Sequence, residues 1–225
     1  MVKTLLQNPW GLWYNMEKGG MTMSYLIAIG LGYLLGCSNL AYWLSKRHKV
    51  DFRKGGSGNL GASNTTVLLG WRAGVTVALH DIGKAALAVA LAKLLFPDVA
   101  YAAVAAGVAA VLGHVFPFYL KFKGGKGLAS FFGTVLTLNW KVGLIIALLL
   151  LLITLVTDFL SLGTLTVSVV APVGIFLSTG SLILPLILAI ASVVLVYKHI
   201  ENIHRLLNRT EIGLRSALRG DNRVK

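Results

Sequence analysis

Lysines and glycines are interleaved in a short loop between two apolar segments, residues 121–127. Its glycines, Gly124, Gly125 and Gly127, can adopt positive φ and bring the backbone close to a ligand. Lys126 adds a full charge that reaches phosphate as a point donor. A helix is expected to begin directly after the loop, and its N-terminus would direct free N–H groups and a partial positive charge at an anion. The loop therefore predicts a phosphate cradle at the membrane surface.

A simpler interpretation is a flexible loop whose lysines only fix the orientation of the chain in a membrane. Three glycines within four consecutive residues are not needed for that purpose, which favours the cradle. The spacing is not that of a soluble P-loop, which places four residues between its first glycine and the Gly-Lys-Ser/Thr.

A second glycine-rich loop contains Ser57, Gly58 and Asn59. Glycine with small polar residues favours turns and backbone concavities that bind anions. Taken alone, the loop could equally be an ordinary turn before a short helix capped at Ser63 or Asn64. Its expected location on the same membrane face as the cradle favours a shared role in binding.

Ionisable residues also occur within the apolar segments. Asp81 and Lys84 are three residues apart, so they are expected to pair on one helix face toward the bundle interior. His114 precedes Phe116 and Pro117 at the predicted membrane edge. It either orients the cradle through a hydrogen bond or is an interfacial imidazole with no chemical duty.

Residues 196–211 form a third polar stretch, at the end of the last apolar segment. On a continuing helix, His199 and Asn202 would share a face because they are three residues apart. The simpler interpretation is a solvated helix beside the membrane.

The composition identifies the class of protein. Of 225 residues, 56% are hydrophobic and 13% charged, and the formal net charge is +13. A soluble domain carries about a quarter charged residues, so this is a polytopic membrane protein. Its basic residues flank apolar runs, which favours anionic lipids or a phosphorylated substrate over nucleic acid. A single cysteine excludes an internal disulfide, and no metal cluster is suggested.

The predicted architecture is an all-α integral membrane protein with about seven transmembrane helices. Apolar runs place them at about 24–45, 72–96, 99–118, 127–139, 142–158, 162–178 and 182–199. Basic residues collect on one side, which puts the N-terminus outside and the C-terminus in the cytoplasm. Three regions are expected: an N-terminal extension of unknown role at 1–22, a membrane domain at 23–211 and a basic cytoplasmic tail at 212–225.

Three blocks, GSGNLGASN, LGHVFPFYLKFKGGKG and YKHIENIHRLL, together resemble the bacterial membrane acyltransferases that use acyl-phosphate to acylate glycerol 3-phosphate. The resemblance implies transfer of a fatty acyl group to the 1-hydroxyl of glycerol 3-phosphate, releasing phosphate and lysophosphatidic acid. It also implies a monomer in the bacterial inner membrane, with membrane lipids around it, a cytoplasmic active site and no cofactor.

The resemblance also assigns site residues by position. Ser57, with its neighbours Gly58 and Asn59, and Lys126 fall where the family contacts phosphate, and the three cradle glycines match its glycerol-phosphate loop. His199 and Asn202 match the family's essential pair and are the expected catalytic residues.

Further positions match or depart from the family pattern. Glu211 matches an acidic residue that supports the structure, and Thr164 falls where the family usually has serine, as a substrate contact. Val67 replaces an arginine that binds phosphate, Asp158 a basic residue and Arg209 a glycine. The departures keep one alternative open, a divergent paralogue with another phospho-substrate or no turnover. A transporter of anionic headgroups is an alternative of another class, but the sequence shows no paired halves and its polar motifs collect on one membrane face.

Overall fold

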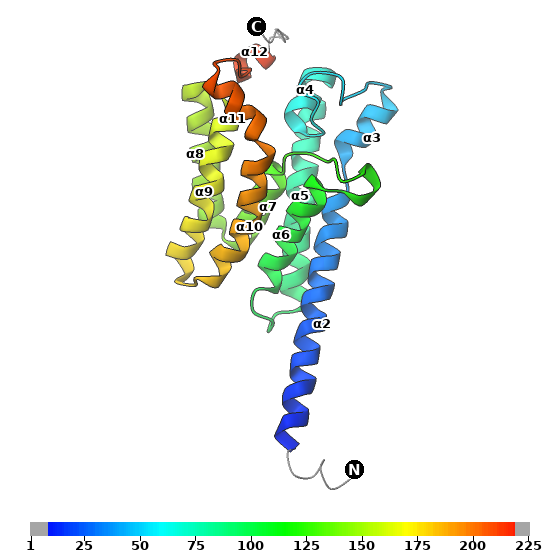
Figure 1. The fold of residues 1–225 in the computed structure, drawn as a ribbon, viewed down its shortest axis with the longest axis vertical. Coiled ribbons are helices and arrows are strands. Elements are labelled where there is room, and N and C mark those ends of the chain that lie inside the picture. The colour runs from blue at the N-terminus through cyan, green and yellow to red at the C-terminus, as the bar shows by residue number, and fades with distance from the viewer. Residues whose placement is uncertain (1–8, 219–225) are drawn as a thin grey trace.

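The computed structural model describes the backbone of residues 9–218 and the side chains of residues 20–216. Residues 1–8 of the predicted extension and 219–225 of the predicted tail lie outside this range. Within it all the regular secondary structure is helical (Figure 1). In order, the helices are α2 (Pro9–Cys37), α3 (Leu40–Arg47), α4 (Ala62–Leu69), α5 (Trp71–Leu95), α6 (Ala102–Val115), the 3-10 turn η1 (Phe118–Leu120), α7 (Leu128–Leu138), α8 (Trp140–Thr157), α9 (Leu160–Thr179), α10 (Ile183–Lys198), α11 (Ile200–Leu207) and α12 (Leu214–Leu218).

Small residues allow α2 to lie along α6. A Cβ added at Gly32 would be 2.2 Å from the carbonyl oxygen of Ala106, and one added at Gly36 would be 2.1 Å from that of Ala110. Glycines one helical turn apart permit such close backbone approach between membrane helices. α2 also extends beyond the rest of the bundle at its N-terminal end (Figure 1).

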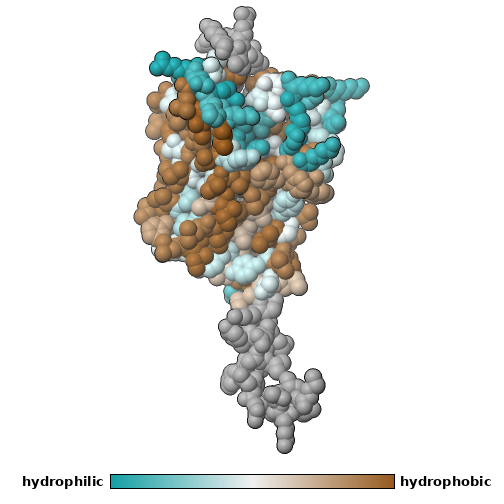
Figure 2. Space-filling model, viewed as in Figure 1, coloured by the Kyte–Doolittle hydropathy of each residue, from teal (hydrophilic) through white to brown (hydrophobic). Residues whose placement is uncertain are grey.

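The outer surface of the bundle is apolar. Leu79, Leu148 and Leu186 are more than half exposed, while the core that α6 to α10 share is closed by fully buried side chains such as Phe131 and Leu195. Figure 2 shows hydrophobic residues around the middle of the molecule and hydrophilic residues gathered at one end. A surface of this kind suits lipid rather than water, so this is a multi-pass membrane protein.

Five helices of the described residues are long and apolar enough to cross a membrane, and six if α10 and α11 form one bent span. Each predicted segment contains a helix, but three details differ. The first helix runs through the predicted boundary at residue 22 and is interrupted at Ser38 and Asn39. The segment predicted at 127–139 holds the 11-residue α7, and the last span bends by 51° at His199.

Candidate active site

The cradle folds back against the end of α6. Gly124 N–H donates to the carbonyl of Val115 at 2.9 Å, and Gly125 N–H donates to the carbonyl of His114 at 3.1 Å. Gly127 has φ 98°, in the left-handed region that favours glycine, and is the N-cap of α7. The predicted sequence of glycine loop and then helix N-terminus is therefore confirmed.

The cradle has no room for larger residues. A Cβ on Gly124 would lie 2.0 Å from the carbonyl oxygen of His114. A Cβ on Gly125 would lie 2.2 Å from His114 Nε2 and 2.7 Å from the carbonyl oxygen of Leu60. Arg53 also donates to the carbonyl of Lys123. The cradle is thus packed between His114 and the second glycine-rich loop, and the two loops lie side by side.

His114 is buried and belongs to a charged network below the cradle. Lys84 Nζ lies 2.8 Å from both Asp81 Oδ1 and His114 Nδ1, and it donates to the carbonyl of Ser38 at 2.6 Å. The predicted pairing of Asp81 with Lys84 is confirmed. His114 is 3% exposed, so the interpretation as an interfacial imidazole is wrong. It bonds to the cradle through its backbone carbonyl, which accepts from Gly125 N–H, whereas Nδ1 of its ring faces Lys84 and Asp81.

Lys126 connects the cradle to α11. Its ammonium donates to Asn202 Oδ1. Asn202 Nδ2 donates to Glu211 Oε1 at 2.6 Å, and Arg205 Nε donates to Glu211 Oε2 at 2.7 Å. Residues 76 positions apart in the chain thus form one polar cluster at the end of the bundle that carries α3, α4 and α11 (Figure 1).

His199 occupies the bend between α10 and α11. The prediction of a continuous helix through this point is wrong, because α10 ends at Lys198 and the chain turns by 51°. His199 Nδ1 lies 2.7 Å from the carbonyl oxygen of Leu195. A carbonyl only accepts, so Nδ1 carries the hydrogen and Nε2 of the neutral ring is left as an acceptor.

Comparison with known proteins shows which family the chain belongs to. The family model described as glycerol-3-phosphate acyltransferase matches residues 26–209. The chain belongs to this family. A glycerol-3-phosphate acyltransferase 1 of Oceanobacillus iheyensis is 36% identical over 203 residues, covering 86% of this chain and 97% of the relative. A glycerol-3-phosphate acyltransferase of Thermoanaerobacter pseudethanolicus is 40% identical over 188 residues, covering 82% of this chain and 92% of the relative.

Two solved structures agree. PlsY (YgiH), an integral membrane glycerol 3-phosphate acyltransferase in its glycerol 3-phosphate form, matches with a TM-score of 0.80 at 33% identity, covering 84% of this chain and 95% of that chain. Its lysophosphatidic acid form matches with a TM-score of 0.79 at 32% identity, covering 87% and 98%.

Lys126 has an unusual environment for a lysine. Burial, and then the positive charge of Arg205, lower its pKa from 10.5 to about 8. The ammonium is therefore poorly compensated, although Glu211 lies nearby. An added phosphate would supply the missing negative charge, which is the chemistry that a glycerol-3-phosphate acyltransferase requires of its site.

Sequence reasoning missed Ser161. Its hydroxyl donates to Glu211 Oε1 at 2.8 Å, so it holds the carboxylate that holds Asn202. The available signal was spacing, because Ser161, Thr164 and Ser168 recur on one buried face of α9. Thr164 is 1% exposed and its hydroxyl donates to the carbonyl of its own helix at Leu160, 2.8 Å away.

The second loop is organised by a buried asparagine. Asn64 Nδ2 lies within hydrogen-bond distance of the carbonyls of Phe52, Gly55 and Asn59, and its Oδ1 accepts from Ser57 N–H at 2.8 Å. The predicted cap at Ser63 or Asn64 is wrong, because α4 begins at Ala62 with Gly61 as N-cap. The Asn64 side chain faces the loop that precedes it instead.

Ser57 is exposed, and Gly58, with φ 70°, continues the turn. Among the described residues no hydrogen bond joins Ser57 to Lys126. The structure therefore brings the two loops to one face through Gly125 and Arg53, but not through Ser57 itself.

The position of the family arginine also faces the second loop. A Cβ on Gly56 would lie 3.5 Å from Val67 Cγ1. Of two nearby arginines, Arg53 reaches the cradle at Lys123, whereas Arg72 stacks over the exposed ring of Trp71 at 5.6 Å. Neither arginine occupies the place of the missing side chain.

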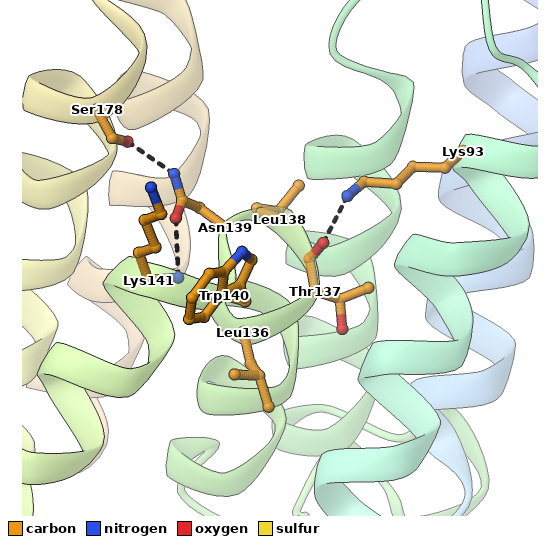
Figure 3. Close-up of a pocket in the computed structure, with 8 residues that line it drawn as sticks. All are labelled: Lys93, Leu136, Thr137, Leu138, Asn139, Trp140, Lys141 and Ser178. Atoms are coloured by element: carbon orange, nitrogen blue, oxygen red, sulfur yellow. Dashed lines mark hydrogen bonds between the residues drawn. The ribbon is translucent and has the colours of Figure 1, made fainter.

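A pocket of about 540 Å³ lies at the turn between α7 and α8, at the end of the bundle away from α11 (Figure 3). Lys93 donates to the carbonyl of Thr137, and Asn139 Nδ2 lies 3.0 Å from Ser178 Oγ. The described residues that line it include no carboxylate and no imidazole. The pocket is separate from the Lys126 cluster and is not the candidate active site.

Proposed function

We propose that this chain transfers a fatty acyl group from acyl-phosphate to the 1-hydroxyl of glycerol 3-phosphate, giving lysophosphatidic acid and phosphate, the first step of phospholipid synthesis. The observation that carries the proposal is the junction of the cradle with α11, where Lys126 meets Asn202 and Glu211. An ammonium that lacks negative charge, beside a glycine loop and a helix N-terminus, suits a phosphate monoester. The glycerol 3-phosphate form of the similar PlsY supports the same acceptor.

The donor in this proposal is already activated, because phosphate is a good leaving group. The protein has to place the hydroxyl near the acyl carbonyl, hold two phosphates against each other and exclude water. Cations and backbone N–H groups offset the charge of those phosphates. The reaction as proposed needs no cofactor.

The residues divide into two roles. Lys126, the N-terminus of α7 at Gly127 and the Ser57 loop bind phosphate, while Gly124 and Gly125, whose N–H groups donate to carbonyls of α6, shape this site. Thr164, the expected substrate contact, is 1% exposed and its hydroxyl donates to Leu160, so a substrate would reach its oxygen only after side chains around it move. His199 and Asn202 position the acceptor. The free Nε2 of His199 suits a general base, and a phosphate oxygen of the substrate is the alternative proton acceptor.

The proposed topology has seven spans, with the N-terminus outside and the active site on the cytoplasmic side of the bacterial inner membrane. The short α7 and the bent pair α10 and α11 complete the five longer helices. The hydrophilic end of the molecule in Figure 2 carries α3, α4 and α11, and basic residues favour the cytoplasm. We propose a monomer as the active form.

A direct assay tests the reaction. Purified protein is incubated with palmitoyl-phosphate and labelled glycerol 3-phosphate, and lysophosphatidic acid is the expected product; palmitoyl-CoA should give none. His199→Ala and Asn202→Ala should each abolish turnover. Near-normal rates in both variants would refute the assignment of these residues.

Val67 supports a second candidate, a paralogue that acts on a different phospho-alcohol, because the family arginine is absent there. Repeating the assay with other phosphorylated alcohols tests it. A transporter of anionic headgroups would form no lysophosphatidic acid with any of them.

A further inference from the structure

The turn between α8 and α9 receives the segment of chain that follows Glu211. Asp158 forms this turn in the left-handed conformation, with φ 69°. Its carboxylate accepts from Arg215 N–H at 2.9 Å, and its carbonyl accepts from Leu214 N–H at 2.7 Å. The guanidinium of Arg215 also donates to the carbonyl of Leu155 at 3.0 Å, at the end of α8. Backbone and side chain on both partners therefore take part.

Gly213 fits this junction because it has no side chain. It is buried, and a Cβ placed on it would lie 1.9 Å from Asp158 Oδ2. Its φ is not in the left-handed region, so the requirement is one of space rather than of backbone conformation. The Asp158 carboxylate can therefore occupy its position only because residue 213 has no side chain.

The start of α9, directly after this turn, also holds Glu211 itself. Ser161, three residues after Asp158, donates to Glu211 Oε1 at 2.8 Å, and Glu211 in turn accepts from Asn202. The order of contacts runs from the α8–α9 turn to Glu211, then to Asn202 and then to Lys126. After the residues that contact Asp158, helix α12 continues beside α4 (Figure 1).

We propose that Asp158 is a positioning residue for acyl transfer: by docking residues 213–215 it holds Glu211 where that carboxylate can orient Asn202 toward Lys126. This inference rests on the proposed function. It concerns a position where the resemblance described above leads us to expect a basic residue and this chain has Asp158. A basic side chain there would accept no hydrogen bond from the N–H of residue 215.

Two substitutions at this position distinguish the effect of losing the carboxylate from the effect of changing the left-handed backbone conformation. Asp158→Gly keeps the freedom for positive φ and removes the side-chain acceptor of Arg215 N–H, while the backbone carbonyl that accepts from Leu214 stays. Asp158→Asn keeps an acceptor oxygen and tolerates the left-handed conformation. With glycerol 3-phosphate, we expect Asp158→Gly to raise KM at least about fivefold and to lower kcat/KM at least about tenfold, since a small misplacement of a positioned group costs about that much or more. Asp158→Asn should recover most of the loss.

The KM distinguishes positioning from mere instability. Loss of folded enzyme lowers the apparent kcat and leaves KM for glycerol 3-phosphate unchanged, and that result in Asp158→Gly would overturn the inference. Asp98→Gly is the matched control, because Asp98 is exposed in the turn between α5 and α6. It should leave both constants unchanged.

A double-mutant cycle tests the contact with Gly213. Gly213→Ala should reduce kcat/KM in the wild-type background, because its Cβ meets the Asp158 carboxylate. The same change should have little further effect in the Asp158→Gly background, where the obstacle is gone. Equal losses in both backgrounds would contradict a direct coupling.

A spin label at Ser216→Cys reports docking without reference to activity. Ser216 is exposed, and Cys37 is buried, so protein without the new cysteine serves as the labelling control. We expect an immobilised label in the wild-type background and in Asp158→Asn, and a mobile label in Asp158→Gly. A label that stays immobilised in Asp158→Gly, or a mobile label with wild-type kinetics, would overturn the inference. Wild-type protein that makes no lysophosphatidic acid while the label still responds would instead refute the proposed function.

Discussion

The side-chain nitrogen of Asn202 lies 2.6 Å from Glu211 Oε1, across the turn that ends α11. This contact fixes the orientation of the amide, because only its nitrogen can donate to a carboxylate. The amide oxygen is consequently left to accept from the ammonium of Lys126. Glu211 therefore determines that the oxygen, and not the nitrogen, of the Asn202 amide is directed at Lys126.

Asn202→Asp should be severely impaired, since it places a second carboxylate against Glu211. We expect lysophosphatidic acid formation to fall at least about a hundredfold, in keeping with about 3 kcal/mol for a broken buried polar contact. Adding Glu211→Gln should restore at least about tenfold of this activity, because the new amide can donate to the aspartate. A double variant no better than Asn202→Asp would contradict the orientation given above.

Activity should decline as pH rises through about 8, because the lowered pKa of Lys126 means that its ammonium is lost there. The expected signature is a fall in kcat/KM for glycerol 3-phosphate. Lys126→Arg keeps its charge at these pH values, so its profile should stay flat even if its rate is lower. A wild-type profile identical to that of the arginine variant would rule out Lys126 as the titrating group.

Unfolding does not explain this predicted decline. An unfolded lysine has a pKa near 10.5, so between about 8 and 10.5 the unfolded chain binds more protons at this site than the folded chain. The contribution of Lys126 to stability therefore rises with pH over the same range in which activity falls. Thermal unfolding measured at each pH separates the two effects.

Gly125→Ala should abolish activity, because its Cβ would lie 2.2 Å from His114 Nε2 and would push the cradle out of place. Gly83→Ala is the matched control, since a Cβ at that position of α5 meets no atom within 4 Å. Alanine should stabilise the helix there by about 0.5–1 kcal/mol. Comparable activity of the two variants in the lysophosphatidic acid assay would argue against a cradle of fixed shape.

Val67→Arg should raise activity on glycerol 3-phosphate. A charge-assisted hydrogen bond to phosphate contributes about 1.5–3 kcal/mol, which corresponds to about a ten- to hundredfold lower KM. Val67→Gln, which adds polar hydrogen-bonding groups on a shorter side chain without a charge, is the control and should give a smaller gain. If the arginine gives no gain, another cation already serves the phosphate or the substrate differs.

Arg209→Gly should stabilise the protein. Arg209 has φ 56° at the turn after α11, a conformation that disfavours side chains by about 1 kcal/mol. Thermal unfolding in detergent should shift upward by about 2–4 °C. Asn208→Gly is the control, because Asn208 has φ −84° and glycine there gains no relief. An unchanged or lower midpoint in Arg209→Gly would contradict the assigned strain.

Local patterns predicted the parts of the site that depend on local structure. The glycines of the cradle indicated a loop of special conformation, and the spacing of Asp81 and Lys84 indicated their pairing. The break at His199 was not predictable in the same way, because no proline or glycine lies near it in the chain. At the turn, the ring nitrogen Nδ1 of His199 lies 2.7 Å from the carbonyl oxygen of Leu195, a contact that the sequence does not indicate.

Contacts between distant segments could not be predicted from the sequence either. Ser161 meets Glu211 across 50 residues, and Asp158 meets Arg215 across 57. Neither pair has a periodicity that would indicate it. From the sequence, Asp158 was notable only because the resemblance led us to expect a basic residue there, and its hydrogen bonds to Leu214 and Arg215 show what the carboxylate contacts.

The shortness of α7 sets how deep the chemistry lies. Its 11 residues rise about 16 Å, whereas the 18 residues of the adjoining α8 rise about 27 Å. Both helices meet at Asn139, so Gly127 is recessed by about 10 Å from the far end of α8. In the proposed reaction, a cradle at this depth would admit glycerol 3-phosphate from the aqueous side while the acyl chain of the donor stays in the lipid leaflet.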